Sequence, residues 1–304
     1  MEFPYRTYSS YLREKYGTAA YRVGVDGGFS CPNRHADRMG GGCTYCDPFG
    51  SRSTYLGETE IDLEGQIHKS IAAMKKRYRA EIFMLYFQAY TSTDGPVDEL
   101  KALYDRGLGL YDFSELIVST RPDCLDEERA DLLASYSRAD FEVWVELGLQ
   151  SIHGETLDRI NRGHGPDEFY RAMELLEERG IKRTVHLIFG LPGEDRAMMM
   201  ETVEAVNKLK PEGIKIHNLH IPSRSPMYRE YERGELTFPG SERHISYLAD
   251  ALEIIDKETI IMRLTTDTPS PRNSTPGNFL NKTEISRRVA ELLLSRGSYQ
   301  GKKT

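Results

Sequence analysis

The sequence lacks two features that often set the class of a protein: a long apolar stretch and an excess of positive charge. Among its 304 residues, 40 Lys and Arg stand against 47 Asp and Glu, which gives a formal net charge of −7. A membrane-spanning helix needs roughly 18 or more apolar residues in a row, and nonspecific binding to nucleic acid rests on summed positive charge. The sequence therefore argues against a membrane protein and against a broad, nonspecific nucleic-acid binder.

The first residues, Met1 to Arg6, are not followed by the apolar segment that marks a secretory signal peptide. We therefore expect a cytoplasmic protein, in a compartment where thiols stay reduced and available to metal. A hydrophobic fraction of 39% is enough for a sizeable core.

Cysteine is scarce, but three of the four cysteines lie together in one short stretch. Cys31, Cys43 and Cys46 have the spacing C-x11-C-x2-C, whereas Cys124 stands alone. Grouped thiols in a reducing compartment usually hold a metal. A structural zinc site wants four protein ligands, whereas a [4Fe–4S] cluster held by three thiolates keeps one iron open. The loop therefore predicts an iron–sulfur cluster, and the alternative is zinc with His35 as the fourth ligand.

Apolar runs alternate with amphipathic stretches along most of the chain. The segment 81–87 is almost entirely apolar, as in a strand that is buried on both faces. Strands are predicted over residues 21–25, 81–87, 116–120, 141–149, 184–189, 213–221 and 259–264, and helices over 58–77, 96–110, 125–136, 166–179, 195–209, 245–255 and 284–294. Strict β/α alternation predicts a parallel sheet with helices outside it, either as an open doubly wound sheet or as a barrel.

The chain shows no internal repeat and no linker before about residue 267. We expect an N-terminal lead-in over residues 1–20, a core over 21–266, and an irregular segment followed by a helix over 267–304. The cysteine loop comes directly after the first predicted strand. This is the carboxyl end of a strand, where α/β folds carry their chemistry.

The cysteine loop and five further motifs resemble the radical S-adenosylmethionine (SAM) enzymes. The cysteine loop ends in Cys43-Thr-Tyr-Cys46, and the other motifs follow it in order: Tyr86-Phe-Gln-Ala-Tyr-Thr91, Thr120-Arg-Pro-Asp-Cys124, Glu142-Val-Trp-Val-Glu-Leu-Gly-Leu-Gln-Ser151, Arg159-Ile-Asn-Arg-Gly-His164 and His186-Leu-Ile-Phe-Gly-Leu-Pro-Gly-Glu194. The long cysteine spacing resembles the branch that includes the catalytic subunit of Elongator. The chain is most similar to the bacterial YhcC/YtqA-type radical SAM family, over most of residues 20–265.

The resemblance implies both a fold and a reaction. The fold is a partial (β/α)6 TIM-like barrel of parallel strands with N- and C-terminal additions. In such enzymes the open iron of a [4Fe–4S] cluster chelates the amino and carboxylate groups of SAM. One electron from the reduced cluster cleaves a C–S bond, and the 5′-deoxyadenosyl radical takes hydrogen from the substrate. The cofactors supply the difficult chemistry, and the protein orients them.

The resemblance also implies the ligands of the cluster and the neighbours of SAM. Cys31, Cys43 and Cys46 correspond to the cluster ligands, and Tyr45 is expected to pack beside the adenine or the cluster. At the end of the second strand the family often has a Gly-Gly-Glu run that meets the methionyl amine. This sequence has no such run, so we expect the segment with Gln88 and Tyr90 to serve instead. Glu146 and Gln150 are expected at the ribose, Arg162 at the methionine carboxylate, and Gly190, Leu191 and Pro192, within the turn that ends at Glu194, along the adenine.

Two of these motifs have plainer interpretations. Glu146 is equally consistent with a structural ion pair to Arg121 or Arg162. Cys124, a lone cysteine after a strand, is expected to be a small buried side chain rather than a ligand.

The expected function is that of a tRNA-modifying transferase that acts on the side chain of the wobble uridine. The loop residues Arg224, Arg229 and Arg233, together with the basic C-terminal segment, are candidates for contacts to tRNA phosphates. A low-potential donor such as flavodoxin or ferredoxin would supply the electron. The alternatives are a radical SAM enzyme for a small metabolite or a peptide, and a non-catalytic binding module that is stabilised by zinc.

Overall fold

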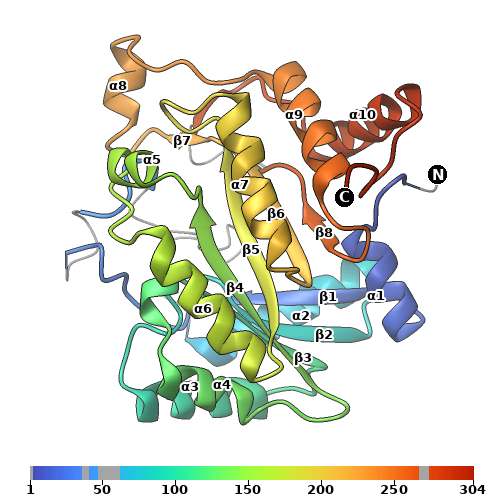
Figure 1. Cartoon of the computed structure of the whole chain (residues 1–304). Coiled ribbons are helices and arrows are strands. Elements are labelled where there is room, and N and C mark those ends of the chain that lie inside the picture. The colour runs from blue at the N-terminus through green and yellow to red at the C-terminus, as the bar shows by residue number, and fades with distance from the viewer. Residues whose placement is uncertain (1–2, 36–40, 47–61, 267–273) are drawn as a thin grey trace.

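The computed structural model describes residues 3–35, 41–46, 62–266 and 274–304. Seven strands form one parallel sheet in the order β1-β2-β3-β4-β5-β6-β8. They are β1 (Ala20–Val25), β2 (Ile82–Phe87), β3 (Glu115–Thr120), β4 (Glu142–Gln150), β5 (Lys182–Phe189), β6 (Gly213–Asn218) and β8 (Ile260–Arg263). The sheet curves into a partial barrel with helices along its outer face (Figure 1). The predicted partial TIM-like fold is confirmed.

The helices between strands lie close to the predicted positions. They are α2 (Leu63–Tyr78), α3 (Val97–Gly109), α4 (Glu127–Ala134), α6 (Pro166–Glu178), α7 (Arg196–Lys208) and α9 (Ser241–Ile254), and α10 (Lys282–Ser295) packs on α9 (Figure 1). The helix predicted over 58–77 begins at Leu63, because the Asp62 side chain caps it by accepting from the Gly65 amide at 2.8 Å. Its predicted residues 58–61 lie outside the described residues.

The central strands form because their side chains are apolar on both faces. In β2, Phe83 to Phe87 are all buried, and β1 pairs beside it with Val23 opposite Leu85 and Val25 opposite Phe87. A parallel strand that is covered by helices outside and by side chains inside needs this composition. The sheet therefore places the carboxyl ends of all its strands at one edge.

One predicted strand is wrong in length. The run 213–221 is divided, so that β6 ends at Asn218 and β7 (Ile221–Pro222) pairs antiparallel with β9 (Ser274–Thr275). The Asn218 side-chain oxygen accepts from the Thr265 hydroxyl at 2.8 Å and from the Thr266 amide at 2.9 Å. These bonds tie the end of β6 to the residues after β8, and the chain then leaves the sheet.

The predicted lead-in contains helix α1 (Tyr8–Tyr16), which covers the amino-terminal end of the barrel. Lys15 Nζ lies 2.6 Å from carboxylate oxygens of both Glu115 and Glu142, the first residues of β3 and β4. Side chains of α1 also pack against Met84, Ile117 and Trp144, so the helix covers this end of the barrel. None of the helices in the described part of the chain is both long and apolar enough to cross a bilayer.

His244 on α9 is buried beside Phe189 and Phe279, and its Nε2 lies 2.9 Å from the Leu264 carbonyl oxygen. Burial lowers the pKa of His244 from 6.5 to about 4. Between these two pH values the unfolded chain binds more protons than the folded one, so stability falls as the pH falls.

We expect His244→Gln to flatten this acid dependence. We expect the free energy of unfolding of the wild type, measured in urea, to fall as the pH is lowered from 6.5 to 5. The fall should be up to about 2 kcal/mol for each buried neutral histidine. His68→Gln, at an exposed position on α2, is the matched control and should keep the full slope. Equal slopes for wild type and His244→Gln would contradict the assignment.

Candidate functional site

The cysteine loop lies at the carboxyl edge of the sheet, between the end of β1 and the segment that follows α5 (Gly154–Arg159). Within the loop, the Cys46 amide donates to the Cys43 carbonyl at 3.0 Å, so the C-x2-C pair forms one tight turn. The Thr44 amide donates to the Ile160 carbonyl at 2.9 Å. The position predicted from sequence, at a strand's carboxyl end, agrees with the structure.

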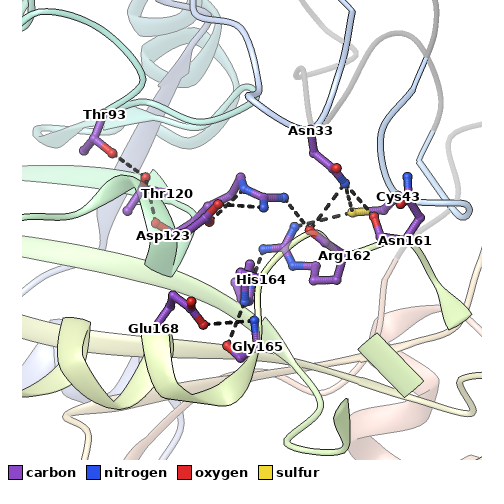
Figure 2. A network of polar contacts seen from close by, with 12 residues as sticks. Asn33, Cys43, Thr93, Thr120, Asp123, Asn161, Arg162, His164, Gly165 and Glu168 are labelled. Carbon is purple, nitrogen blue, oxygen red and sulfur yellow. Dashed lines mark hydrogen bonds and ion pairs between the residues drawn. The ribbon is translucent and has the colours of Figure 1, made fainter. Parts of the chain in front are cut away.

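Two asparagines clasp the loop onto the segment 160–163. Asn33 Nδ2 donates to the Asn161 carbonyl at 2.5 Å, and Asn161 Nδ2 donates to the Gly42 carbonyl at 2.8 Å (Figure 2). Gly163 has φ +73°, and a side chain there would meet Asn33 Oδ1 at 2.7 Å. The clasp therefore requires both the left-handed backbone and the missing side chain at Gly163.

Arg162 is buried and directed at Cys43 (Figure 2). Its Nη1 lies 3.5 Å from Cys43 Sγ, and its Nη2 donates to the Gly148 carbonyl at 2.5 Å. Burial alone would raise the pKa of the Cys43 thiol, but Arg162, together with Arg121 and Tyr45, outweighs burial and holds that pKa below its usual range. A thiolate is the form that binds metal, so Cys43 has the chemistry of a ligand.

The three thiols are not a finished set of ligands. Cys43 is buried, whereas Cys31 and Cys46 are half-buried, and all three are free of disulfides. Within the described ranges, no group of three or more His, Cys, Asp or Glu side chains is arranged to hold a metal ion. His35, the candidate fourth zinc ligand, has an exposed side chain. The loop places three thiols at the carboxyl edge of the sheet, and binding of the cluster would complete their arrangement.

Tyr45 lies between the two cysteines of the turn and packs with the apolar cluster that contains Ile188 and Leu191. Burial, followed by the neighbouring Cys43 thiolate, raises the pKa of Tyr45 well above its usual value. The phenol therefore stays neutral and presents an aromatic face beside the loop.

The segment after β2 lies next to the cysteine loop. The Gln88 amide donates to the Val25 carbonyl at 3.1 Å, and the Thr91 amide donates to the Ser30 carbonyl at 3.1 Å. Tyr90 has φ +56°, a left-handed conformation that is uncommon for an aromatic residue. Gln88 and Tyr90 are therefore brought to the cysteine loop as expected, although their contacts to SAM stay a prediction.

β4 ends in an irregular turn of the backbone. The pairing with β5 shifts between Gly148 and Gln150, and Gln150 has φ +79°. A side chain at Gly148 would lie 2.8 Å from Arg162 Nη2 and 2.9 Å from Gln150 Nε2. The absence of a side chain at Gly148 leaves room for Arg162 and Gln150, the two polar residues that are expected to contact SAM.

Glu146 lies deeper in the barrel and has its own partners. Its side chain is fully buried, with Tyr86 Oη at 2.5 Å, Arg22 Nη1 at 2.7 Å and His186 Nε2 at 3.0 Å, and Lys215 pairs with it as well. The structural alternative named Arg121 or Arg162 as the partner, and this is wrong because the strand register brings β1, β5 and β6 to Glu146 instead. Four side chains already contact the Glu146 carboxylate, and its contact to the ribose stays a prediction.

The turn after β5, residues 190–194, packs closely against the segments that contain Pro239 and Ser151. Gly190 has φ +87°, and a side chain there would meet the Pro239 ring at 2.5 Å. The Glu194 side chain accepts a hydrogen bond from the Ser151 hydroxyl. Asp195 is the cap of α7, with its side chain accepting from the Met198 amide at 3.0 Å. The turn therefore joins the ends of β4 and β5.

Two arginines of the candidate RNA-binding set are exposed on or near α8 (Tyr228–Glu232), namely Arg224 and Arg229. Arg233 forms an ion pair with Glu235. In the C-terminal segment Arg287 pairs with Glu284 and Glu291, and Arg288, Arg296 and Lys303 pair with carboxylates of α9. The basic C-terminal segment is therefore largely neutralised within the fold.

Three polar residues around the loop were not expected from the sequence. Arg121 donates to the Arg162 carbonyl at 2.8 Å and pairs with Asp123 at 2.9 Å, and His164 is buried beside them (Figure 2). Asn33 is the third. Arg121 lies within a quoted motif, but the Arg162 carbonyl that it contacts is 41 residues away, so only the fold reveals its support of Arg162. Cys124 is half-buried, and burial raises the pKa of its thiol to about 12, which agrees with an inert side chain.

Comparisons with known proteins agree with this geometry. Residues 31–206 match the Radical SAM superfamily, and residues 211–294 match the Radical_SAM C-terminal domain. The chain is 40% identical to YtqA of Bacillus subtilis, over 98% of this chain and 92% of that protein. It is 37% identical to YhcC of Escherichia coli, over 86% of this chain and 82% of that protein.

More distant similarities reach the Elongator-like branch. The chain is 29% identical to the tRNA uridine(34) acetyltransferase of Methanocaldococcus jannaschii, over 51% of this chain and 28% of that protein. A solved structure of Methanocaldococcus infernus Elp3 shares the fold, with a TM-score of 0.69 and 21% identity, over 79% of this chain and 60% of that chain.

The matched region contains all three cysteines of the loop, and its residues suit the cofactors of the superfamily. Three thiols leave one iron of a cubane cluster for another ligand, and the buried Arg162 has an Nε without a hydrogen-bond partner among the described residues. These findings exclude the non-catalytic zinc module. The chain belongs to the radical SAM superfamily and is an enzyme whose cofactors are a [4Fe–4S] cluster and SAM.

Proposed function

We propose that this enzyme modifies the side chain of the wobble uridine in a tRNA. The observation that carries the proposal is the similarity of half the chain to a tRNA uridine(34) acetyltransferase, within a fold shared with Elp3. The matched length is a minor part of that protein. The proposal therefore concerns the substrate, a uridine in tRNA, and not transfer of an acetyl group.

Cys31, Cys43 and Cys46 would hold the cluster, which supplies the electron that cleaves SAM when both are bound. The Asn33 and Arg162 side chains donate toward Cys43 Sγ from 3.8 and 3.5 Å. Hydrogen bonds to a ligating sulfur help to set the potential of a cluster. The electron itself would come from a low-potential donor of the flavodoxin or ferredoxin kind.

Arg162, Gln150 and the 88–90 segment surround the place where SAM would bind. Arg162 would hold the methionine carboxylate through a charge-assisted bond, and Gln88 or Tyr90 would receive the amine. Gln150 would contact the ribose, together with Glu146 if that carboxylate exchanges one of its donors. Tyr45 and the backbone of Gly190, Leu191 and Pro192 would line the adenine. Together these groups would orient SAM for the reaction.

The test is nucleoside analysis of tRNA from a strain that lacks the gene. We expect a modified wobble uridine to disappear and its unprocessed precursor to accumulate. The wild-type gene should restore the product, whereas a Cys43→Ser gene should not. Purified enzyme with SAM and reductant should then convert the precursor in bulk tRNA, with release of 5′-deoxyadenosine. Unchanged wobble nucleosides would refute the proposed substrate.

A small metabolite or a peptide is the second candidate, and one observation favours it. The net charge is −7, and most cations of the C-terminal segment are paired with carboxylates. Binding of tRNA falls steeply as salt rises, because phosphate contacts release counterions. Turnover that is insensitive to salt would favour this candidate over tRNA.

A further inference from the structure

The barrel interior contains a buried cluster of polar and charged side chains, of which only Glu146 has a proposed contact to SAM. We call it the floor cluster: Arg22 on β1, Tyr86 on β2, Glu146 on β4, His186 on β5 and Lys215 on β6. Glu146 is its centre, because Tyr86, Arg22, His186 and Lys215 all contact that carboxylate. Five of the seven strands, all except β3 and β8, thus each direct one ionisable or polar side chain to the Glu146 carboxylate or contribute that carboxylate.

The charges of the floor cluster do not balance. Arg22 and Lys215 are cations, and the ion pairs that the structure gives for both end on Glu146. An uncompensated buried charge is costly, so the interior favours a second negative charge beside Lys215.

Two side chains of the floor cluster are partly exposed, and a histidine lies next to one of them. The side chains of Arg22 and His186 are 17% and 16% exposed. Two residues beyond Lys215, on the same face of β6, His217 has its ring 5.3 Å from that of His186. His217 Nδ1 lies 2.5 Å from the Thr266 hydroxyl, whereas its buried Nε2 has no hydrogen-bond partner among the described residues. His217 Nε2 is therefore a buried polar group next to His186 of the floor cluster, without a partner among the residues that the structure describes.

We propose that the floor cluster and His217 bind a negatively charged group of the substrate. Lys215 and Arg22 would supply the charge, and His217 would donate from Nε2 in the tautomer whose Nδ1 accepts from Thr266. Glu146 then acts as a positioning residue that fixes the two cations. The proposal rests on the proposed function only in that the barrel interior receives the substrate. The ligand chemistry is that of a carboxylate or a phosphate, since both offer anionic oxygens to these donors.

The single tryptophan offers a direct readout. Trp144 lies two residues before Glu146 on β4 and packs in the same apolar cluster as Tyr86. The reconstituted enzyme, with saturating SAM and no reductant, would be titrated with acetate and, separately, with inorganic phosphate at constant ionic strength. We expect a saturable change in Trp144 fluorescence. The anion that binds more tightly identifies the carboxylate or the phosphate as the preferred group.

Two variants and one control decide the assignment. Lys215→Met should weaken anion binding at least tenfold, and His217→Phe, which keeps the floor cluster intact, should also weaken it about tenfold. Lys208→Met, at an exposed position on α7, should bind as the wild type does. The proposal is overturned if neither anion gives a saturable change, or if folded His217→Phe and Lys215→Met bind as tightly as Lys208→Met. Because no tRNA takes part, failure here is independent of the tRNA experiment.

Discussion

Cys43→Ser should remove the [4Fe–4S] cluster and reduce SAM cleavage by about 10³-fold or more, as expected when an indispensable group is lost. Cys43 is the most buried thiol of the loop, and Arg162 lies 3.5 Å from its sulfur. Serine keeps the shape but offers a hydroxyl that does not ionise beside Arg162 as a thiol does. Iron content, the absorbance of the reconstituted protein near 400 nm and 5′-deoxyadenosine release measure the effect.

Cys124→Ser is the matched control, because Cys124 lies outside the loop and burial keeps its thiol protonated. This variant should retain iron and SAM cleavage at wild-type levels. If Cys124→Ser lost the cluster and Cys43→Ser kept it, the assignment of ligands would have to be revised.

Glu146→Gln should lower the free energy of unfolding by about 3–5 kcal/mol, because it leaves Arg22 and Lys215 buried without a counter-charge. Burial alone would raise the pKa of Glu146, but Lys215, Arg22 and His186 together hold it well below its usual value. The carboxylate is therefore ionised at neutral pH, and an amide of the same size removes only the charge and one acceptor. Urea denaturation of the anaerobic protein measures the loss.

Glu242→Gln provides the comparison for Glu146→Gln. Glu242 pairs with Arg288 on the surface, with 71% of its side chain exposed. An exposed pair of this kind contributes at most about 1 kcal/mol. Losses of the same small size in both variants would show that Glu146 is not the centre of a buried charge cluster.

Much of the fold follows from local sequence signals. The apolar run 81–87 and the amphipathic segments that alternate with such runs predict the order of strands and helices. A strand that is covered on both faces must be almost entirely apolar, so it is easy to recognise in the sequence. Short elements were missed: α5, α8 and the β7–β9 pair contain only a few residues, so no period develops in them. The end of β6 was misplaced because it depends on bonds from Asn218 to Thr265 and Thr266, which lie far along the chain.

The candidate site could be predicted from the sequence only where the spacing within one motif indicates its chemistry. The spacing of the cysteines indicates a cluster site, and Arg162 was assigned from the resemblance of its motif to the family. The floor cluster could not be found in that way, because its residues come from five strands and meet through the register of the sheet. The available signal was weak: Arg22, Glu146 and Lys215 are charged residues within otherwise apolar strands.

Two hydrogen bonds fix the backbone of Thr44 and so reduce the conformational entropy of the cysteine loop. The Thr44 amide is bonded to the Ile160 carbonyl, and its carbonyl accepts from the Met227 amide at 2.8 Å. The two bonds fix the backbone between Cys43 and Cys46, and fixing the backbone of one residue costs roughly 1–2 kcal/mol. The protein has thus met part of the entropic cost of gathering the cysteines before any iron arrives.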